Sequence, residues 1–148
     1  MKYAILLLSS LFLFSCEDSD VLSDEQAPSI KYGTSFGFCV GYCLTDIEVS
    51  SDRLYYVSYG NNNSVAPKTI NMDYTKEKYL KILNLVDQEK FLALDPVIGC
   101  PDCADGGAEW IEMTIGKRTK KVTFEYGKEV EGVEDLILKL RKIASELK

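Results

Sequence analysis

The sequence predicts an α+β fold in which an antiparallel sheet carries two helices on one face. Three observations predict it: segments that alternate in hydrophobicity as strands do, a hairpin pattern in the second half, and two segments with apolar residues on one helical face. The order is strands, helix, strands, helix. Each half of the domain is therefore expected to be a hairpin followed by a helix.

The first half of the domain contains four segments with strand character. They are rich in β-branched and aromatic residues, which favour strands, and they cover residues 31–38, 44–49, 54–59 and 69–72. Thr75 then precedes a segment in which Tyr79, Ile82 and Val86 share one helical face, so we expect Thr75 to cap a helix. Residues 87–94 are expected to continue this segment irregularly.

The second half predicts a hairpin and a C-terminal helix. In the hairpin, two runs of alternating apolar residues flank a turn at Gly116-Lys117, which leaves one apolar face for burial. The apolar positions are Ile111, Met113, Ile115, Val122, Phe124 and Tyr126. An amphipathic helix follows, and its apolar stripe consists of Leu136, Ile137, Leu140, Ile143, Ala144 and Leu147.

The N-terminus has the layout of a bacterial lipoprotein precursor. Residues 1–15 contain one lysine and an apolar run that is shorter than the roughly 20 residues needed to span a bilayer. Leu13-Phe14-Ser15-Cys16 resembles the lipobox, whose cysteine becomes the lipid-bearing N-terminus. We therefore expect a signal peptide over residues 1–15, a lipidated Cys16 that begins an acidic tether over residues 16–29, and a single domain over residues 30–148.

The tether also predicts a location. Its residues 17–29 include five acidic side chains and no basic one. Acidic residues directly after the lipidated cysteine resemble the export tag of Bacteroidota lipoproteins, so we expect a lipid-anchored protein of the outer membrane that faces the cell surface. The same acids retain lipoproteins at the inner membrane in other bacteria, and a periplasm-facing location is the alternative. In either case the lipid on Cys16 makes the membrane a partner.

The composition excludes several classes of function. The chain has 17 basic and 23 acidic residues, a net charge of −6, which argues against nucleic acid as a partner because phosphates are bound by clustered Lys and Arg. Histidine is absent, so a Ser-His-Asp triad, a Cys-His dyad and any histidine-containing metal site are excluded. We expect a protein that is not an enzyme and that binds no cofactor.

Four cysteines remain once Cys16 is lipidated: Cys39, Cys43, Cys100 and Cys103. In an exported protein an even number favours two disulfides, for which three connectivities are open. Zinc bound by all four thiolates is an alternative, because the Cys100-x2-Cys103 spacing is typical of a zinc knuckle. A third interpretation is thiol–disulfide exchange at Cys100 and Cys103.

The segment Cys39-Val40-Gly41-Tyr42-Cys43, which leads into a strand, resembles the C-x-G-x-C opening of a family of small secreted Bacteroidota proteins of unknown function. Members of that family share the order hairpin, helix, hairpin, helix. The resemblance implies the fold, export and a self-contained first cysteine pair. It therefore implies local pairing, Cys39 with Cys43 and Cys100 with Cys103, and it implies no chemistry.

Acidic residues in the second half offer two further candidate sites. Asp102, Asp105 and Glu109 surround a glycine turn, and Glu112 and Glu125 lie on the non-core faces of the two hairpin strands. We expect solvated turn acids in the first case, in preference to a calcium site. In the second case we expect an ordinary exposed sheet face, in preference to a catalytic carboxylate pair.

Aromatic residues supply the candidate binding surface. Trp110 alternates with the apolar face of its strand, and Tyr55 and Tyr59 lie in a tyrosine-rich strand. Aromatic side chains that are not buried favour sugar rings or protein hot spots. The predicted function is a membrane-anchored extracytoplasmic lipoprotein that acts as a non-catalytic interaction module for a protein or a glycan. The alternative is thiol–disulfide exchange or structural zinc binding by the cysteines.

Overall fold

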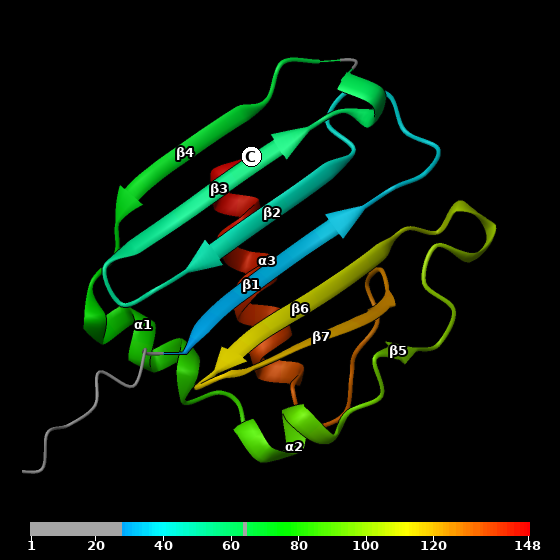
Figure 1. Ribbon diagram of the computed structural model, residues 1–148. Helices are drawn as coiled ribbons and strands as arrows, with labels where there is room; N and C mark the ends of the chain where they lie inside the picture. The colour runs from blue at the N-terminus through cyan, green and yellow to red at the C-terminus, as the bar shows by residue number, and fades with distance from the viewer. Residues whose placement is uncertain (1–27, 64) are drawn as a thin grey trace, which may run out of the picture.

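A computed structural model describes residues 28–63 and 65–148 of the chain. Its centre is a seven-stranded sheet with the strand order β4-β3-β2-β1-β6-β7-β5 (Figure 1). The strands are β1 (Ser29–Ser35), β2 (Leu44–Val49), β3 (Arg53–Tyr59), β4 (Lys68–Asp73), β5 (Val97–Ile98), β6 (Ala108–Ile115) and β7 (Arg118–Glu125). The predicted signal peptide, Cys16 and most of the tether lie outside the described residues.

Neighbouring strands are antiparallel except at one edge, where β5 pairs in parallel with β7 over two residues. β1 lies near the centre and pairs with β2 on one side and with β6 on the other, which joins the two halves of the domain. The α+β class and the antiparallel sheet are confirmed. The first half is not a hairpin, however. The segment expected at residues 69–72 pairs with β3 along its whole length, so β1 to β4 form a four-stranded meander.

The helices are α1 (Lys76–Leu83), α2 (Gln88–Ala93) and α3 (Glu134–Leu147). Thr75 caps α1 as expected, because its side chain accepts a hydrogen bond from the N–H of Lys78 at 3.4 Å. The sequence predicts irregular chain where α2 forms. α2 begins there because a carboxylate oxygen of Asp87 accepts from the N–H groups of Glu89 and Lys90, at 3.1 and 3.2 Å.

The second hairpin is confirmed, with one difference at its end. β6 and β7 pair from Ala108 with Glu125 to Ile115 with Arg118. The turn between them uses Gly116, whose positive φ of 58° suits a residue without a Cβ. Tyr126, expected on the buried face, is 43% exposed because β7 ends one residue before it.

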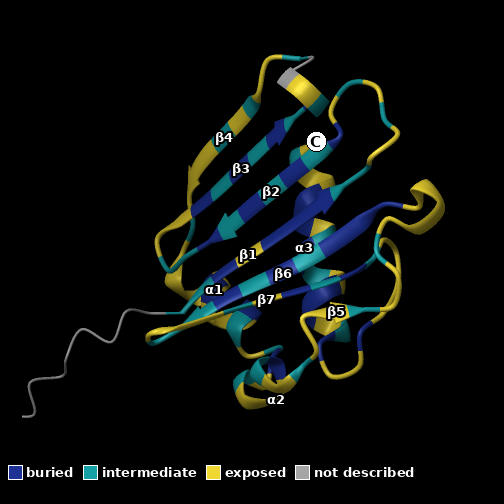
Figure 2. Ribbon diagram, turned by 45° about the vertical axis from the view of Figure 1, so that its right-hand side comes forward, coloured by how far each residue is buried: buried dark blue, intermediate teal, exposed yellow. Residues whose placement is uncertain are grey.

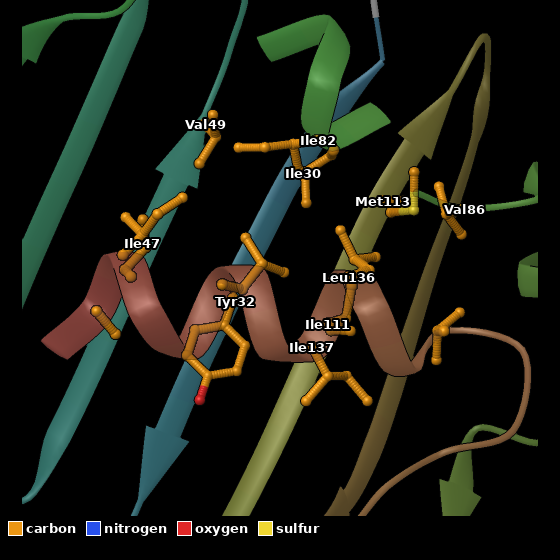
Figure 3. Packing of buried hydrophobic residues seen from close by; sticks show 14 of the residues in the cluster. Ile30, Tyr32, Ile47, Val49, Ile82, Val86, Ile111, Met113, Leu136 and Ile137 are labelled. Atoms are coloured by element: carbon orange, nitrogen blue, oxygen red, sulfur yellow. The ribbon is translucent and has the colours of Figure 1, made fainter. Parts of the chain in front are cut away.

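One face of the sheet packs against α3, which crosses behind the strands in Figure 1. Figure 3 shows Tyr32 and Ile111 from the sheet beside Ile137 from α3. The predicted stripe of α3 is buried as expected, with Leu147 partly so. The short helices α1 and α2 add Tyr79, Ile82 and Phe91 to the same hydrophobic cluster. The cluster therefore lies on one side of the sheet, and no helix of the described residues covers the opposite face.

Candidate functional site

The face of the sheet opposite α1, α2 and α3, here called the open face, carries the three aromatic residues that the sequence singled out. Tyr55 and Tyr59 on β3 and Trp110 on β6 all line one shallow groove of about 530 Å³. Each of the three is partly exposed; Figure 2 colours the strands by burial. The other lining residues are of mixed charge or apolar: Lys31, Leu44, Asp46, Ile47, Glu48, Glu112 and Lys121. The structure thus brings the predicted surface together in one place.

Trp110 is fixed on the open face by both strands that neighbour β6. It pairs in register with Gly33 of β1, and a Cβ added to Gly33 would lie only 2.1 Å from Cζ2 of the indole. The ring therefore occupies the space that a side chain on β1 would need. From β7, the ammonium of Lys121 lies 4.5 Å from the centre of the ring, a cation–π contact.

Asp46 of β2 lies between Tyr59 and Trp110. The hydroxyl of Tyr59 donates to Oδ2 of Asp46 at 3.0 Å. The other carboxylate oxygen approaches Gly33, where the indole of Trp110 also lies. Burial raises the pKa of Tyr59, and the hydrogen bond to Asp46 raises it further, so the phenol keeps its proton at neutral pH. The open face therefore presents aromatic rings next to an oriented carboxylate.

A row of alternating charge crosses the open face beside these aromatics. In strand order it consists of Glu48, Lys31, Glu112 and Lys121, each facing the next in the register of the sheet. Lys31 and Glu112 are 3.6 Å apart, and Arg53 lies 3.7 Å from Glu48. Pairs of this kind are exposed and contribute about 0–1 kcal/mol each. They also leave the row with little net charge.

Glu112 and Glu125 do not form a carboxylate pair. Glu112 faces Lys121, whereas Glu125 faces Ala108 near the other end of the hairpin. An oxygen of Glu125 accepts the N–H of Cys100 at 2.9 Å, which ties the second cysteine loop to β7. The two carboxylates therefore lie apart along the hairpin, and that of Glu125 is engaged by the loop instead of standing on an ordinary exposed face.

The helix side of the sheet holds a buried ion pair that the sequence patterns do not predict. Glu109, expected to be a solvated turn acid, is 0% exposed. Nε of Arg141 on α3 donates to its two oxygens at 3.0 and 3.2 Å, and the N–H of Gly127 donates to one of them at 3.1 Å. Burial and the charge of Glu109 raise the pKa of nearby Tyr32. The alternation of β6 could have predicted the burial of Glu109, since Glu109 lies on the same face of the strand as the buried Ile111.

Disulfide bonds join Cys39 to Cys43 and Cys100 to Cys103, with Cα–Cα distances of 5.6 and 5.5 Å. This is the local pairing that the family resemblance implies. Each bond closes its own loop, so the sulfur atoms are not arranged as the four-thiolate zinc site considered as an alternative. Within residues 28–63 and 65–148, no group of three or more acidic or cysteine side chains is placed to hold a metal ion.

The loop closed by Cys39 and Cys43 exposes large apolar side chains that the sequence analysis did not select. Phe38 is 90% exposed, Val40 is fully exposed at 102%, and Tyr42 is 52% exposed. The sequence could have predicted this exposure. A disulfide ring of five residues has no interior, so the apolar residues within it and beside it have little opportunity to be buried by their own loop.

Comparison of the chain with models of known protein families found no match, and comparison with curated proteins also found none. The resemblance to the secreted Bacteroidota family therefore stays a prediction. In the part of the chain that the structure describes, none of the helices has both the length and the apolar character needed to cross a membrane. Lipidation at Cys16 falls outside that part and stays a prediction as well.

Proposed function

We propose that this chain is an extracytoplasmic lipoprotein, held at the outer membrane by lipid on Cys16, that binds a neutral glycan on its open face without catalysing a reaction. The observation that carries the proposal is the gathering of Tyr55, Tyr59 and Trp110 along one shallow groove. Aromatic rings with an apolar body and a polar edge suit the apolar faces of sugar rings. The location on the cell surface is part of the proposal, and it follows from the tether sequence.

The polar groups of the groove support a ligand rich in hydroxyl groups. Asp46 lies between two of the aromatic residues and offers carboxylate oxygens as acceptors, and Lys31 and Lys121 offer ammonium donors. Because the charges alternate along the row that contains the lysines, a strongly charged partner gains little from this face. A protein ligand would also need an apolar interface core, whereas here the charged side chains of Asp46 and Lys121 lie against Tyr59 and Trp110.

A non-catalytic role is supported by how the carboxylates of the face are engaged. Glu112 is paired with Lys31, Asp46 accepts from Tyr59, and Glu125 holds the N–H of Cys100. A glycosidase instead needs two carboxyl groups about 5–10 Å apart that face one another across the scissile bond. The absence of histidine from the whole sequence removes the commonest general base.

The test of glycan binding uses Trp110 as its own reporter, because it is the single tryptophan in the chain. The purified domain is screened on an array of neutral and acidic glycans, and binders are then titrated while tryptophan emission is recorded. We expect a neutral glycan to shift the emission in a saturable way. Tyr55→Ala should weaken this binding by roughly tenfold or more, which is the size expected for a stacking residue at the centre of a site.

Leu138→Ala is the matched control, since Leu138 is 54% exposed on α3 and lies on the other side of the sheet. Its binding should equal that of the unmodified domain. The glycan proposal is wrong if no glycan on the array is bound, or if Tyr55→Ala and Leu138→Ala bind equally well.

Anchoring is tested separately with Cys16→Ser in the full chain. Because lipid on Cys16 is the proposed anchor, the substitution should move the protein from the membrane fraction to the soluble fraction. Persistence of the Cys16→Ser protein in the membrane pellet would contradict lipid anchoring at this residue.

Thiol–disulfide exchange is the second candidate, and one observation favours it. The Cys100–Cys103 bond lies in an exposed loop in which Asp102, Ala104 and Asp105 all have positive φ, between 54° and 60°. Such backbone strain concentrates at functional sites, and exposed disulfides are the more easily exchanged ones. Exchange predicts that the domain accelerates reduction of insulin by dithiothreitol and that Cys100→Ser abolishes this activity.

A further inference from the structure

The loop between β1 and β2, residues 36–43, holds apolar side chains in water at the end of the sheet (Figure 1, cyan). Phe38, Val40 and Tyr42 within it are 90%, 102% and 52% exposed. Full burial of a side chain such as Phe or Val is worth about 1.5–3 kcal/mol, and folding leaves this gain unused here. Contiguous exposed apolar patches mark interaction sites, and these three side chains all lie within residues 38–42 of one short loop.

The loop is held rigidly in the conformation that exposes these residues. The Cys39–Cys43 disulfide closes it, and Cys43 is only 2% exposed, with its N–H donating to the carbonyl of Tyr59 at 3.1 Å. At the other end of the loop, the side-chain amide of Asn61 donates to the carbonyls of Phe36 and Gly37, at 3.3 and 3.1 Å. A partner that binds the loop therefore pays little conformational entropy to order it.

The second disulfide loop lies at the same end of the sheet and adds negative charge. Figures 1 and 2 both show the two loops together at this end. The carboxylate of Asp102 lies against Gly37, so closely that a Cβ on Gly37 would be 3.1 Å from Oδ2. Asp102 and Asp105 are both exposed. The apolar residues are therefore flanked on this side by carboxylates.

On its other side, the loop borders a hollow. A cavity of about 290 Å³ lies beside Phe36, Tyr42 and Cys43. Its floor includes hydroxyl side chains of Thr34, Thr45 and Ser58, which face one another across β1, β2 and β3 and are each at most 5% exposed. This end of the molecule thus combines projecting apolar side chains with an adjacent recess.

We propose that this end of the domain, the Cys39–Cys43 loop with the cavity beside it, docks onto a second, folded protein. The partner offers an apolar pocket for Phe38 and Val40, a basic side chain opposite Asp102, and a side chain of its own that enters the cavity. A specific interface covers about 800 Å² on each side, which three side chains alone do not supply, so both disulfide loops take part. This proposal concerns a different surface from the open face and does not rest on glycan binding.

Two observations favour a protein over a lipid surface as the occupant. The carboxylates of Asp102 and Asp105 beside the loop are repelled by anionic head groups. The cavity, whose lining also includes Lys68 and Lys148, is a recess that a side chain of a folded partner can enter. The loop also lies at the far end of β1 from Ser29, about 20 Å along the strand at roughly 3.3 Å per residue. The loop therefore lies at the opposite end of β1 from Ser29, the last residue of the predicted tether.

The test places the photoreactive residue p-benzoylphenylalanine at position 38 of the full, lipidated chain on intact cells of the native host. The same residue at position 138 is the control, because Leu138 is also an exposed apolar residue but lies on α3. We expect a discrete protein adduct from position 38 and none of that size from position 138. In the same cells, Val40→Ser should lower the yield of that adduct by roughly tenfold, because it removes the apolar side chain that the partner's pocket would bury.

Asp102→Asn tests the charge without disturbing the backbone, because Asn tolerates the left-handed conformation found there (φ 60°). It should lower the adduct yield and make that yield less sensitive to salt. Thermal unfolding of each purified variant confirms that the domain is folded, which is expected because Val40 and Asp102 are exposed.

Several outcomes would overturn the proposal. Adducts with lipid alone, or retention of the purified protein on phosphatidylglycerol vesicles through Phe38, would identify a membrane surface. An adduct of twice the chain mass would identify a second copy of the chain. Absence of a discrete adduct, or an adduct unchanged by Val40→Ser, would show that the loop is not a docking site.

Discussion

Arg141 of α3 and Glu109 of β6 are joined by two hydrogen bonds from a single guanidinium nitrogen, at 3.0 and 3.2 Å. A second guanidinium nitrogen of Arg141 donates to the carbonyl of Lys128 at 2.6 Å. Gly127, in the same connection between β7 and α3, donates its N–H to Glu109. One arginine therefore links the sheet, the long helix and the segment between them.

Replacing Arg141 should destabilise the domain strongly. In Arg141→Met the carboxylate of Glu109 loses its charged partner while it stays buried, which costs about 3–5 kcal/mol for a fully buried pair. The loss of stability should fall near the lower end of that range, because the Arg141 side chain is 24% exposed. Urea unfolding measures the change. Lys142→Met, at the exposed neighbouring position, should change stability by less than about 0.5 kcal/mol. Equal effects of the two substitutions would contradict a structural role for the pair.

Gly33→Ala should displace the indole of Trp110. The added Cβ would meet the ring at 2.1 Å and Asp46 at 2.7 Å, so the ring must move and the domain should lose about 1–3 kcal/mol. The emission of the single tryptophan should shift to longer wavelength as the ring becomes more exposed to water. In a domain that already carries Trp110→Ala, Gly33→Ala should lower the free energy of unfolding much less than it does in the unmodified domain. A double-mutant cycle measures this difference. A cycle without coupling would show that the two residues do not compete for this space.

Two leucines of α3 provide a matched pair. Leu140 is 0% exposed and Leu138 is 54% exposed. Leu140→Ala removes buried methylene groups and should cost about 2–5 kcal/mol, whereas Leu138→Ala should stay within about 0.5 kcal/mol. Thermal and urea unfolding compare them on the same helix. Similar losses for both variants would mean that α3 is not packed with its predicted stripe on the sheet.

Alkaline pH should lower the free energy of unfolding because Tyr32 ionises. Burial, with the charge of Glu109 as the next cause, raises the pKa of Tyr32 in the folded state. The unfolded chain therefore loses this proton first, near pH ~10. The contribution of protonated Tyr32 to the free energy of unfolding is complete below that pH. It is lost as the pH rises toward the pKa of Tyr32 in the folded state. Tyr32→Phe should flatten this dependence, as measured by urea unfolding at a series of alkaline pH values. An identical pH dependence in both proteins would remove Tyr32 as its cause.

Local sequence patterns predicted the elements that depend on local chemistry. The alternation in β6 and β7, the turn at Gly116, the cap at Thr75 and the stripe of α3 all rest on interactions between residues close in the chain. The same alternation gathered Trp110 on the open face with the tyrosines of β3. These features could be predicted because hydrophobic periodicity carries the necessary information.

Features that depend on distant partners could not be predicted in this way. The pairing of β1 with β6 joins segments more than 70 residues apart, and no local pattern specifies it. In the sequence Glu109 stands beside a glycine turn, and its burial depends on Arg141 of α3 and on the N–H of Gly127, both distant in the chain. Phe38 and Val40 are exposed although they are apolar, so hydrophobicity alone would wrongly predict that they are buried. The short helix α2 was missed because its six residues are too few for a clear periodic pattern.

The central position of β1 in the sheet also determines when this protein is prone to aggregate. Synthesis proceeds from the N-terminus, so β1 to β4 exist before β6, which starts at Ala108. During that interval the β1 edge presents unpaired N–H and C=O groups, a template onto which the strand of another chain can add. The finished sheet is better protected, because β4 at one edge has no buried residue and β5 at the other has two residues. Aggregation is therefore a hazard of the nascent chain much more than of the completed domain.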